Sequence, residues 1–417
     1  MPPLLFGCFP ATYIPPLYLS HAFDFLKDVS QAEIFDGSKA FFDNGHKESN
    51  MWFKRMELEV WFDRYQYEIE YDIGESAVKT LRLKDVSVDL ENVSLRYGYH
   101  KGLPELREAV VEQYSNLNEN NIVVTTGASE ANFVVVSALA GPGDHVIVEH
   151  PNYPSLYEVP RSLGCEVSLF SLRFEDDFRP DLDRLKTLIR PETKLISLTH
   201  PNNPTGSMMT KEELQEVIRF VEEKDIFLLF DETYRHMASD QSLLPPAASL
   251  SEKAISISSM SKCFGLPGIR TGWLATTNSK VLAEVLAIRE QVSIANNALS
   301  EVIAVSVLKR KDEFLQKARS RIEKNREVVA EWMRQQSGFE WVCPEAGVVC
   351  LPRLVEPVTI TPEKLYRQLA EDYKTFVVPG RCFEMDERYF RIGFGADAAE
   401  IQTGLQNLTA AFMDLAT

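Results

Sequence analysis

The chain has 417 residues, of which 45% are hydrophobic and 25% are charged, so it can bury a large core and has room for two domains. Its formal net charge of −17 argues against a surface that binds nucleic acid or an anionic membrane. The six cysteines form no CxxC pair and no metal-ligand spacing, which predicts a reduced, cytoplasmic chain without a metal site.

Residues 1–50 are expected to form an N-terminal arm. Its stretch from Leu4 to Leu19 is apolar but rich in proline, has no basic segment before it and no convincing cleavage site. Neither a secretory signal nor a membrane span is therefore expected. Two roles stay open for the arm: it wraps over a partner subunit, or it covers the mouth of a functional site.

The chain that follows the arm is expected to begin with a helix from Met51 to about Tyr67. We expect its apolar side to carry Trp52, Phe53, Met56 and Val60.

Farther along, strands and helices alternate, which predicts a doubly wound α/β domain with a mainly parallel sheet. Pro104 is expected at the start of one helix, and Thr210 with Glu213 forms a capping box at the start of another. The expected strands cover residues 122–126, 145–148, 194–199, 226–230 and 254–258.

A long helix over 311–336 is expected to lead into a second, smaller α/β domain. The expected division is thus an arm over 1–50, the N-terminal part of the small domain over 51–76, a large domain over 77–300 and the rest of the small domain over 301–417.

The most informative motif follows the expected strand 254–258. Lys262 is a single lysine just after a buried strand, where its amine is costly to desolvate unless it has a function. Ser259 precedes it by three residues and Arg270 follows it by eight. A lysine between a hydroxyl and a guanidinium suits a phosphorylated aldehyde, with the lysine on the carbonyl and the other two on the phosphate. Taken alone, the segment also fits a glycine-rich surface loop with solvated charges.

Two further motifs stand at the ends of expected strands. Asn203-Pro204-Thr205-Gly206 comes shortly after the strand 194–199, and Asp231-Glu232-Thr233-Tyr234 directly follows the strand 226–230. With Ser-x-x-Lys and the arginine eight residues later, this order of motifs resembles class I/II aminotransferases. These are fold type I enzymes that depend on pyridoxal 5′-phosphate. The resemblance runs from about Gly74 to Gly395 and implies an aspartate aminotransferase-like fold, with a large cofactor-binding domain and a smaller α/β domain.

The resemblance also implies a role for each motif. Lys262 would form the Schiff base with the cofactor and move a proton between the substrate Cα and the cofactor, which calls for an amine with a depressed pKa. Asp231 would pair with the pyridinium nitrogen and keep the ring protonated. Tyr234 and Asn203 would hydrogen-bond the phenolic oxygen of the cofactor.

The phosphate of the cofactor would lie at a helix start. Ala128 and Ser129, which follow Gly127, offer backbone N–H groups and a hydroxyl there, and Ser259 and Arg270 complete the site.

Two tyrosines would contact the cofactor, by the same resemblance. Tyr153 would stack on its ring, and Tyr97 would reach the phosphate in the other subunit, which implies a homodimer with shared active sites. Core packing is the alternative for both tyrosines.

On the substrate side, Arg391 matches the arginine that grips the α-carboxylate, and Gly74 matches the glycine whose backbone approaches the same group. Asn203 would also contact the substrate. The usual proline after Gly-Glu is Ser76 in this chain. Arg289 lies near the region where some relatives place an arginine for dicarboxylic side chains, but a solvated charge on a helix is favoured for it.

These residues predict a pyridoxal-phosphate-dependent aminotransferase that acts on an L-amino acid, with a 2-oxo acid as amino acceptor. It is expected to be a cytoplasmic homodimer of amino acid metabolism, with no nucleic-acid or membrane partner. A lyase, cyclase or oxidase with the same cofactor chemistry is the alternative within the enzymes. A non-catalytic regulator is disfavoured because the sequence has no DNA-binding module. The sequence does not identify the amino acid or the acceptor.

Overall fold

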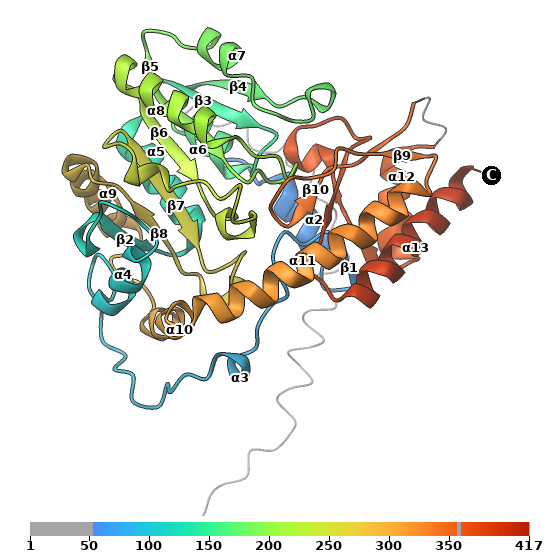
Figure 1. The fold of residues 1–417 in the computed structure, drawn as a ribbon, viewed down its shortest axis with the longest axis horizontal. Coiled ribbons are helices and arrows are strands. Elements are labelled where there is room, and N and C mark those ends of the chain that lie inside the picture. Colours follow the sequence, from blue (N-terminus) through green and yellow to red (C-terminus); the bar gives the residue numbers. More distant parts are fainter. Residues whose placement is uncertain (1–52, 357–359, 417) are drawn as a thin grey trace, which may run out of the picture. The chain divides into compact units, whose positions relative to one another are not determined.

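The computed structural model describes residues 53–356 and 360–416. The expected N-terminal arm over residues 1–50 lies outside the described residues. The described residues 53–356 and 360–416 belong to one compact unit, in which the long helix α11 (Lys311–Arg334) runs between the large sheet and the C-terminal elements (Figure 1). No helix among the described residues has the length and apolar character that a membrane span requires.

A seven-stranded sheet forms the centre of the large part of the fold. Its strands, in spatial order, are β2 (Ile122–Thr125), β8 (Gly272–Ala275), β7 (Ala254–Ser259), β6 (Phe227–Asp231), β5 (Thr193–Thr199), β3 (His145–His150) and β4 (Glu166–Ser171). Only β8 runs antiparallel to its neighbours; the other pairs are parallel. The prediction of a mainly parallel sheet is confirmed.

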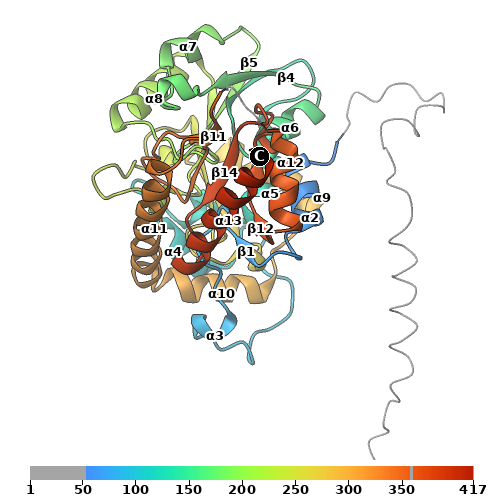
Figure 2. The same ribbon diagram turned by 90° about the vertical axis from the view of Figure 1, so that its right-hand side faces the viewer.

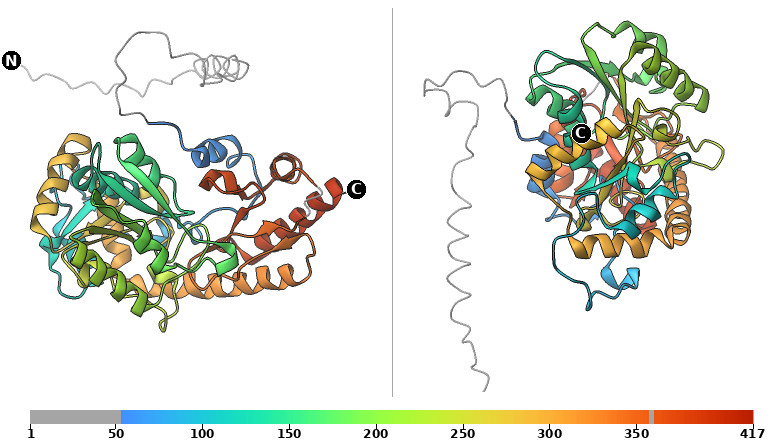
Figure 3. Two further views of the ribbon diagram at one scale, coloured as in Figure 1. Left: turned by 90° about the horizontal axis from the view of Figure 1, so that it is seen from above. Right: turned by 90° about the vertical axis from the view of Figure 1, so that its left-hand side faces the viewer.

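Helices cover both faces of this sheet (Figures 1 and 3). One face packs against α5 (Gly127–Leu139), α6 (Ser155–Ser162) and α9 (Ser279–Val292), and the other against α7 (Leu182–Thr187) and α8 (Lys211–Lys224). Successive side chains of a strand point to opposite faces, so Val146 and Val148 pack on the α5 side and Ile147 on the α8 side. The doubly wound architecture is confirmed.

The remaining elements pack at one end of the sheet and in the C-terminal part of the chain (Figure 2). The helices are α2 (Glu57–Tyr65), α3 (Leu83–Val86), α4 (Pro104–Val111), α10 (Ala298–Leu308), α12 (Pro362–Glu371) and α13 (Ala398–Ala416). The strands are β1 (Tyr71–Asp72), β9 (Phe339–Glu340), β10 (Val349–Cys350), β11 (Arg353–Leu354), β12 (Thr375–Phe376), β13 (Val378–Pro379) and β14 (Phe390–Gly393). Because β1 pairs with β12, the residues before Gly74 pack with the C-terminal part. The expected domain boundaries stay predictions.

Two local signals of the sequence are confirmed. Pro104 occupies the first turn of α4. Thr210 and Glu213 form a reciprocal capping box on α8, since each side chain accepts a hydrogen bond from the other's backbone N–H, at 2.6 and 3.1 Å. The long helix over 311–336 is also present, as α11.

The expectation for the first helix is wrong both in its length and in which residues form its buried face. The helix α2 spans only Glu57–Tyr65, and its buried residues are Leu58, Trp61 and Tyr65. Phe53 and Val60, expected on the apolar side, are exposed. The buried face is set by the C-terminal part of the chain, where the Trp61 indole donates to the Val377 carbonyl oxygen at 2.9 Å.

Candidate active site

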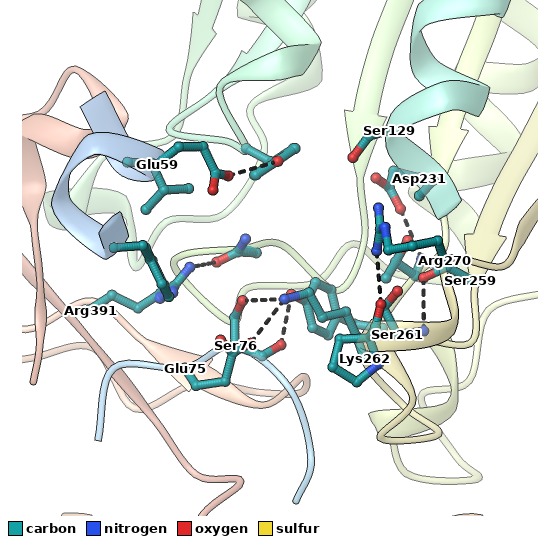
Figure 4. A pocket seen from close by; sticks show the side chains of 18 of the residues that line it. Glu59, Glu75, Ser76, Ser129, Asp231, Ser259, Ser261, Lys262, Arg270 and Arg391 are labelled. Atoms are coloured by element: carbon teal, nitrogen blue, oxygen red, sulfur yellow. Dashed lines mark hydrogen bonds and ion pairs between the residues drawn. The ribbon is translucent and has the colours of Figure 1, made fainter. Parts of the chain in front are cut away.

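A cavity of about 670 Å³ opens where the large sheet meets the segment after α2. The parallel strands β5, β6 and β7 each end at a residue that lines it, namely Thr199, Asp231 and Ser259. Ligands of open α/β sheets bind beyond the carboxyl ends of the parallel strands, and this cavity has that position. Figure 4 shows side chains from both sides converging on it.

Lys262 lines the cavity three residues after the end of β7. Its Nζ donates to Glu75 Oε1 and to Ser76 Oγ, both at 3.0 Å (Figure 4). Burial acts to lower the pKa of this amine, but the charges of Glu75 and Tyr234 and the hydrogen bond to Glu75 hold the pKa above its ordinary value. The sequence led us to expect a depressed pKa, and the anionic neighbour from the segment after β1 reverses that direction.

Asp231, the last residue of β6, lies in the same cavity and is only 7% exposed. Its Oδ1 accepts a hydrogen bond from the Thr233 N–H at 2.9 Å, which fixes the carboxyl group. Burial raises the pKa of Asp231, and the hydrogen bonds from Thr233 oppose that rise. A cationic group bound in the cavity would stabilise the ionised form of this buried carboxylate.

The end of the cavity at α5 carries several anion-binding groups. The helix begins at Gly127, whose φ is +77°, and a Cβ at this position would stand 2.7 Å from Arg270 Nη2. Glycine therefore lets the guanidinium approach the N–H groups of the first helical turn. The hydroxyls of Ser129, Ser259 and Ser261 line the same region, and so does Ala128. This donor set fits a phosphate group.

Ser261 was not among the residues expected from the sequence. It lies directly before Lys262, and its N–H donates to Ser259 Oγ at 3.3 Å. The signal was available, because the segment reads Ser-Met-Ser-Lys and Ser261 lies between the recognised residues Ser259 and Lys262.

The tyrosines and the asparagine expected around a cofactor ring also line the cavity. Tyr153 donates its hydroxyl to Glu59 Oε1 at 3.2 Å, and Tyr234 donates its hydroxyl to the Ser76 carbonyl oxygen at 3.0 Å. Asn203 Oδ1 accepts from Arg391, so the amide NH₂ group is the remaining donor end of Asn203. The contacts of these side chains with a cofactor stay predictions.

Arg391 on β14 is 1% exposed and faces the cavity from the side opposite Arg270 (Figure 4). Its Nε and Nη2 donate to the Gly74 carbonyl oxygen, at 3.0 and 2.8 Å. The Gly74 N–H in turn donates to Asp72 Oδ1 at 2.9 Å. Gly74 thus holds Arg391 in place rather than lining the cavity, and its expected contact with a substrate stays a prediction.

Two expected residues lie away from this cavity. Tyr97 is 84% exposed and does not line the cavity of its own chain, so its reach into a second subunit stays a prediction. Arg289 does not line the cavity either, and the favoured reading as a solvated charge is wrong, because its side chain is 1% exposed. Its Nη1 and Nη2 donate inside the fold to the carbonyl oxygens of His100 and Ile294 and to Asn296 Oδ1, and the Glu130 carboxylate lies 3.7 Å from its Nε.

Three carboxylates of the cavity were also not foreseen: Glu59, Asp72 and Glu75. Glu59 comes from α2, and the other two flank Gly74. Burial and the charge of Glu75 raise the pKa of Asp72 to about 6, whereas the charges of Lys262 and Arg391 outweigh burial and hold the pKa of Glu75 below its ordinary value. Of the three, only Glu75 lies beside residues that the sequence singled out, Gly74 and Ser76, and nothing in that segment indicated a contact with Lys262.

The fold and the site define a pyridoxal-phosphate-dependent enzyme of the aminotransferase type. The sequence profile of the family described as aminotransferase class I and II matches residues 67–408, and the chain belongs to this family. The resemblance that the motifs indicated is thereby confirmed.

The similar proteins include both an aminotransferase and a cyclase. A solved pyridoxal-phosphate-dependent aminotransferase from Streptococcus suis is 30% identical, with a TM-score of 0.82, and the match covers 88% of this chain and 99% of that one. Capreomycidine synthase from Streptomyces vinaceus is 29% identical over 318 residues, 76% of this chain and 81% of that protein. A solved pyridoxal-phosphate-dependent cyclase, OrfR, is 26% identical, with a TM-score of 0.80, and the match covers 89% of this chain and 99% of that one.

Proposed function

We propose that the protein is an aminotransferase that binds pyridoxal 5′-phosphate and moves the amino group of an L-amino acid to a 2-oxo acid. One observation carries this proposal: a single cavity brings together Lys262, Asp231, Arg270 and Arg391. These four residues match the four chemical groups that the reaction has to hold, which are an aldehyde, a pyridinium nitrogen, a phosphate and an α-carboxylate.

The residues present fit the cofactor. Gly127 opens a cradle between Arg270 and the start of α5, where the hydroxyls of Ser259 and Ser261 add donors for the phosphate. Asp231 would hold the ring nitrogen, and Lys262 would hold the aldehyde. When bound, the cofactor supplies an electron-withdrawing ring that stabilises negative charge at the substrate Cα.

The substrate would be held by Arg391. Because Gly74 and Asn203 already fix the plane of the guanidinium, a carboxylate that binds to it takes one orientation, and the Cα–H bond is oriented with it. Of the cationic side chains that line the cavity, Lys262 can become neutral and accept a proton, whereas Arg270 and Arg391 stay protonated, so we assign to Lys262 the proton transfer at Cα.

The test is a product assay with the purified protein and a panel of L-amino acids, each offered with a 2-oxo acid. Transamination yields the 2-oxo acid of the donor and the amino acid of the acceptor in equal amounts. A panel in which no donor gives these products, although the cofactor is bound, contradicts the proposal.

A second candidate is a lyase, cyclase or oxidase that uses the same cofactor on an L-amino acid. The similarity to capreomycidine synthase and to the cyclase OrfR favours it. The same assay separates the two candidates, because release of ammonia or formation of a cyclic product, without an amino acid formed from the acceptor, identifies this second class.

We further propose a homodimer with shared sites, in the cytoplasm and in amino acid biosynthesis. Large apolar side chains lie exposed in two segments near the start of α4 and the end of α9, as a subunit interface would require. They are Leu95, Tyr97, Tyr99, Val292 and Ile294. The cysteines among the described residues are free thiols, which supports a reducing compartment.

A further inference from the structure

Lys262 is held at both ends by one short segment of the chain, residues 75–78. Its Nζ donates to the side chains of Glu75 and Ser76, both at 3.0 Å. Its backbone carbonyl oxygen accepts from the Val78 N–H, also at 3.0 Å. The backbone hydrogen bond therefore keeps the segment that carries both acceptors next to the lysine.

The backbone of this segment is fixed by contacts with three other residues. Asp72 Oδ1 accepts hydrogen bonds from the N–H groups of Gly74 and Glu75, both at 2.9 Å. Gly393 on β14 lies so close that a Cβ there would collide with the Glu75 carbonyl oxygen. On the far side, Tyr234 donates to the Ser76 carbonyl oxygen. These contacts fix the backbone from which the Glu75 carboxylate reaches the amine.

At Ser76 this chain departs from the family that its motifs resemble, in which a proline usually follows Gly-Glu. A proline has no hydroxyl and could not contact the amine. Ser76 is 3% exposed, so its hydroxyl is removed from bulk water and its contact with Lys262 Nζ satisfies a buried polar group.

We propose that Glu75 and Ser76 are positioning residues for the Lys262 amine when it is not bonded to the cofactor, and that they stabilise the ammonium form that arises when the neutral amine takes up the substrate proton. The inference rests on the proposed function, in which Lys262 carries the cofactor and moves the substrate proton.

The proton transfer shows what this contact does. The Cα–H bond of the substrate breaks, its electron pair stays with the substrate, and the proton forms a new N–H bond on the neutral amine of Lys262. The product is an ammonium group. Glu75 supplies an anion and Ser76 an oxygen acceptor for that ammonium, so the transfer ends on a stabilised cation within hydrogen-bond distance of both.

The charged and titratable groups that face Lys262 come from four parts of the fold. Glu75 follows β1, Tyr234 follows β6, Tyr153 precedes α6, and Arg391 lies on β14. Glu75 and Tyr234 raise the pKa of the Lys262 amine, and Arg391 lowers it. Burial and the cation of Arg391 both act to lower the pKa of the amine, so removing the Glu75 charge that opposes them should make the pKa fall.

The experiment uses the full-length protein saturated with pyridoxamine 5′-phosphate, which has no aldehyde and leaves every lysine amine unbonded. Competitive acetylation over a range of pH, followed by peptide mass mapping, gives the pH midpoint of Lys262 reactivity. Glu75→Gln should lower this midpoint by about one pH unit or more. Ser76→Ala should lower it by less, and Glu75→Asp should restore part of the wild-type value.

Glu59→Gln is the matched control, since it removes a carboxylate from the same cavity that does not contact Lys262. A wild-type midpoint in Glu75→Gln, or an equal shift in Glu59→Gln, overturns the proposal. If Glu75→Gln does not fold, Ser76→Ala decides, and an unchanged midpoint there also overturns it. Failure of the proposed function has a separate signature: borohydride reduction of protein loaded with pyridoxal phosphate would label a lysine other than Lys262.

Discussion

The guanidinium of Arg391 donates two hydrogen bonds to one acceptor, the carbonyl oxygen of Gly74, at 3.0 and 2.8 Å. This contact joins β14 to the segment after β1 and fixes a buried cation at the wall of the cavity. Burial lowers the pKa of Arg391, and the anions Glu75 and Asp72 oppose that shift. The result is a planar cation whose orientation is set before a substrate arrives.

Arg391→Lys should impair substrate use while leaving the cofactor bound. A lysine keeps the charge but loses the planar fork, so the α-carboxylate loses at least one charge-assisted hydrogen bond, worth about 1.5–3 kcal/mol. That corresponds to a fall of kcat/KM by about tenfold or more. Steady-state kinetics and the cofactor absorbance measure the two effects. Arg388→Lys, which changes a partly buried arginine that is paired with Asp386 and does not line the cavity, is the control and should keep its kcat/KM.

Lys262→Ala should abolish covalent attachment of the cofactor and most of the turnover. Borohydride reduction of the wild-type protein, followed by peptide mapping, should place the label on Lys262. Lys79→Ala is the control, since Lys79 pairs with Asp397 outside the cavity, and this variant should be labelled as the wild type is. A label on another lysine of the wild-type protein would remove Lys262 from its proposed role.

Asp231→Asn should slow the chemical step without unfolding the protein. The amide keeps an oxygen for the Thr233 N–H but no longer offers a charge to the ring nitrogen of the cofactor. Loss of one charge-assisted interaction in a buried site should cost on the order of 2–4 kcal/mol in the transition state. Single-turnover kinetics measure this. Asp225→Asn, at the exposed end of α8, is the control, and equal rates in the wild type and Asp231→Asn would make Asp231 a structural residue.

Asp72→Asn should stabilise the protein increasingly as the pH rises. Burial and Glu75 raise the pKa of Asp72 from 3.8 to about 6 in the folded state. The folded protein therefore binds this proton more tightly than the unfolded chain does, and the stability that the group contributes is present below pH 3.8 and lost as the pH rises through 6. Asparagine does not titrate and still accepts from the Gly74 N–H.

Denaturant unfolding of the wild type and Asp72→Asn at pH 4 and at pH 7 measures this effect. The free energy of unfolding of the variant, relative to the wild type, should be higher at the upper pH. Asp63→Asn, at an exposed position of α2, is the control for surface charge. A difference between wild type and Asp72→Asn that is the same at both pH values would contradict the raised pKa.

Much of the cavity follows from the sequence because its residues stand at the ends of parallel strands. Asp231 ends β6 and Ser259 ends β7, so adjacent strands deliver them to one edge of the sheet. The fold class followed from the same alternation of strands and helices. The spacing of Lys262 from Ser259 predicts that the two side chains face one ligand, and both line the cavity.

What the sequence did not predict depends on contacts between distant segments. The partners of Lys262, at positions 75 and 76, are 187 and 186 residues away in the chain, and no local pattern pairs them. Arg289 has the spacing of an ordinary helix charge, yet His100 and Asn296 surround it in the fold. The buried face of α2 was misjudged for the same reason, because Val377 fixes it from the C-terminal part.

Tyr97 is 84% exposed and does not line the cavity of its own chain, so a role at the phosphate requires a second subunit. If sites are shared, Tyr97→Ala alone should be strongly impaired and an isolated monomer should be inactive. Sedimentation analysis coupled to an activity assay tests the second point, and a fully active monomer would end the assignment of Tyr97 to the phosphate.

Mixing Lys262→Ala protein with Tyr97→Ala protein provides the positive test. In a hybrid dimer, one site combines the native Lys262 of one chain with the native Tyr97 of the other, while the second site carries both changes. Activity should therefore rise well above that of either parent once subunits exchange. Tyr67→Ala, mixed in the same way, is the control: Tyr67 is exposed but lines the cavity of its own chain. In a hybrid with Lys262→Ala protein, one site therefore lacks Lys262 and the other carries Tyr67→Ala. Neither site is free of both changes, so the hybrid should not recover activity.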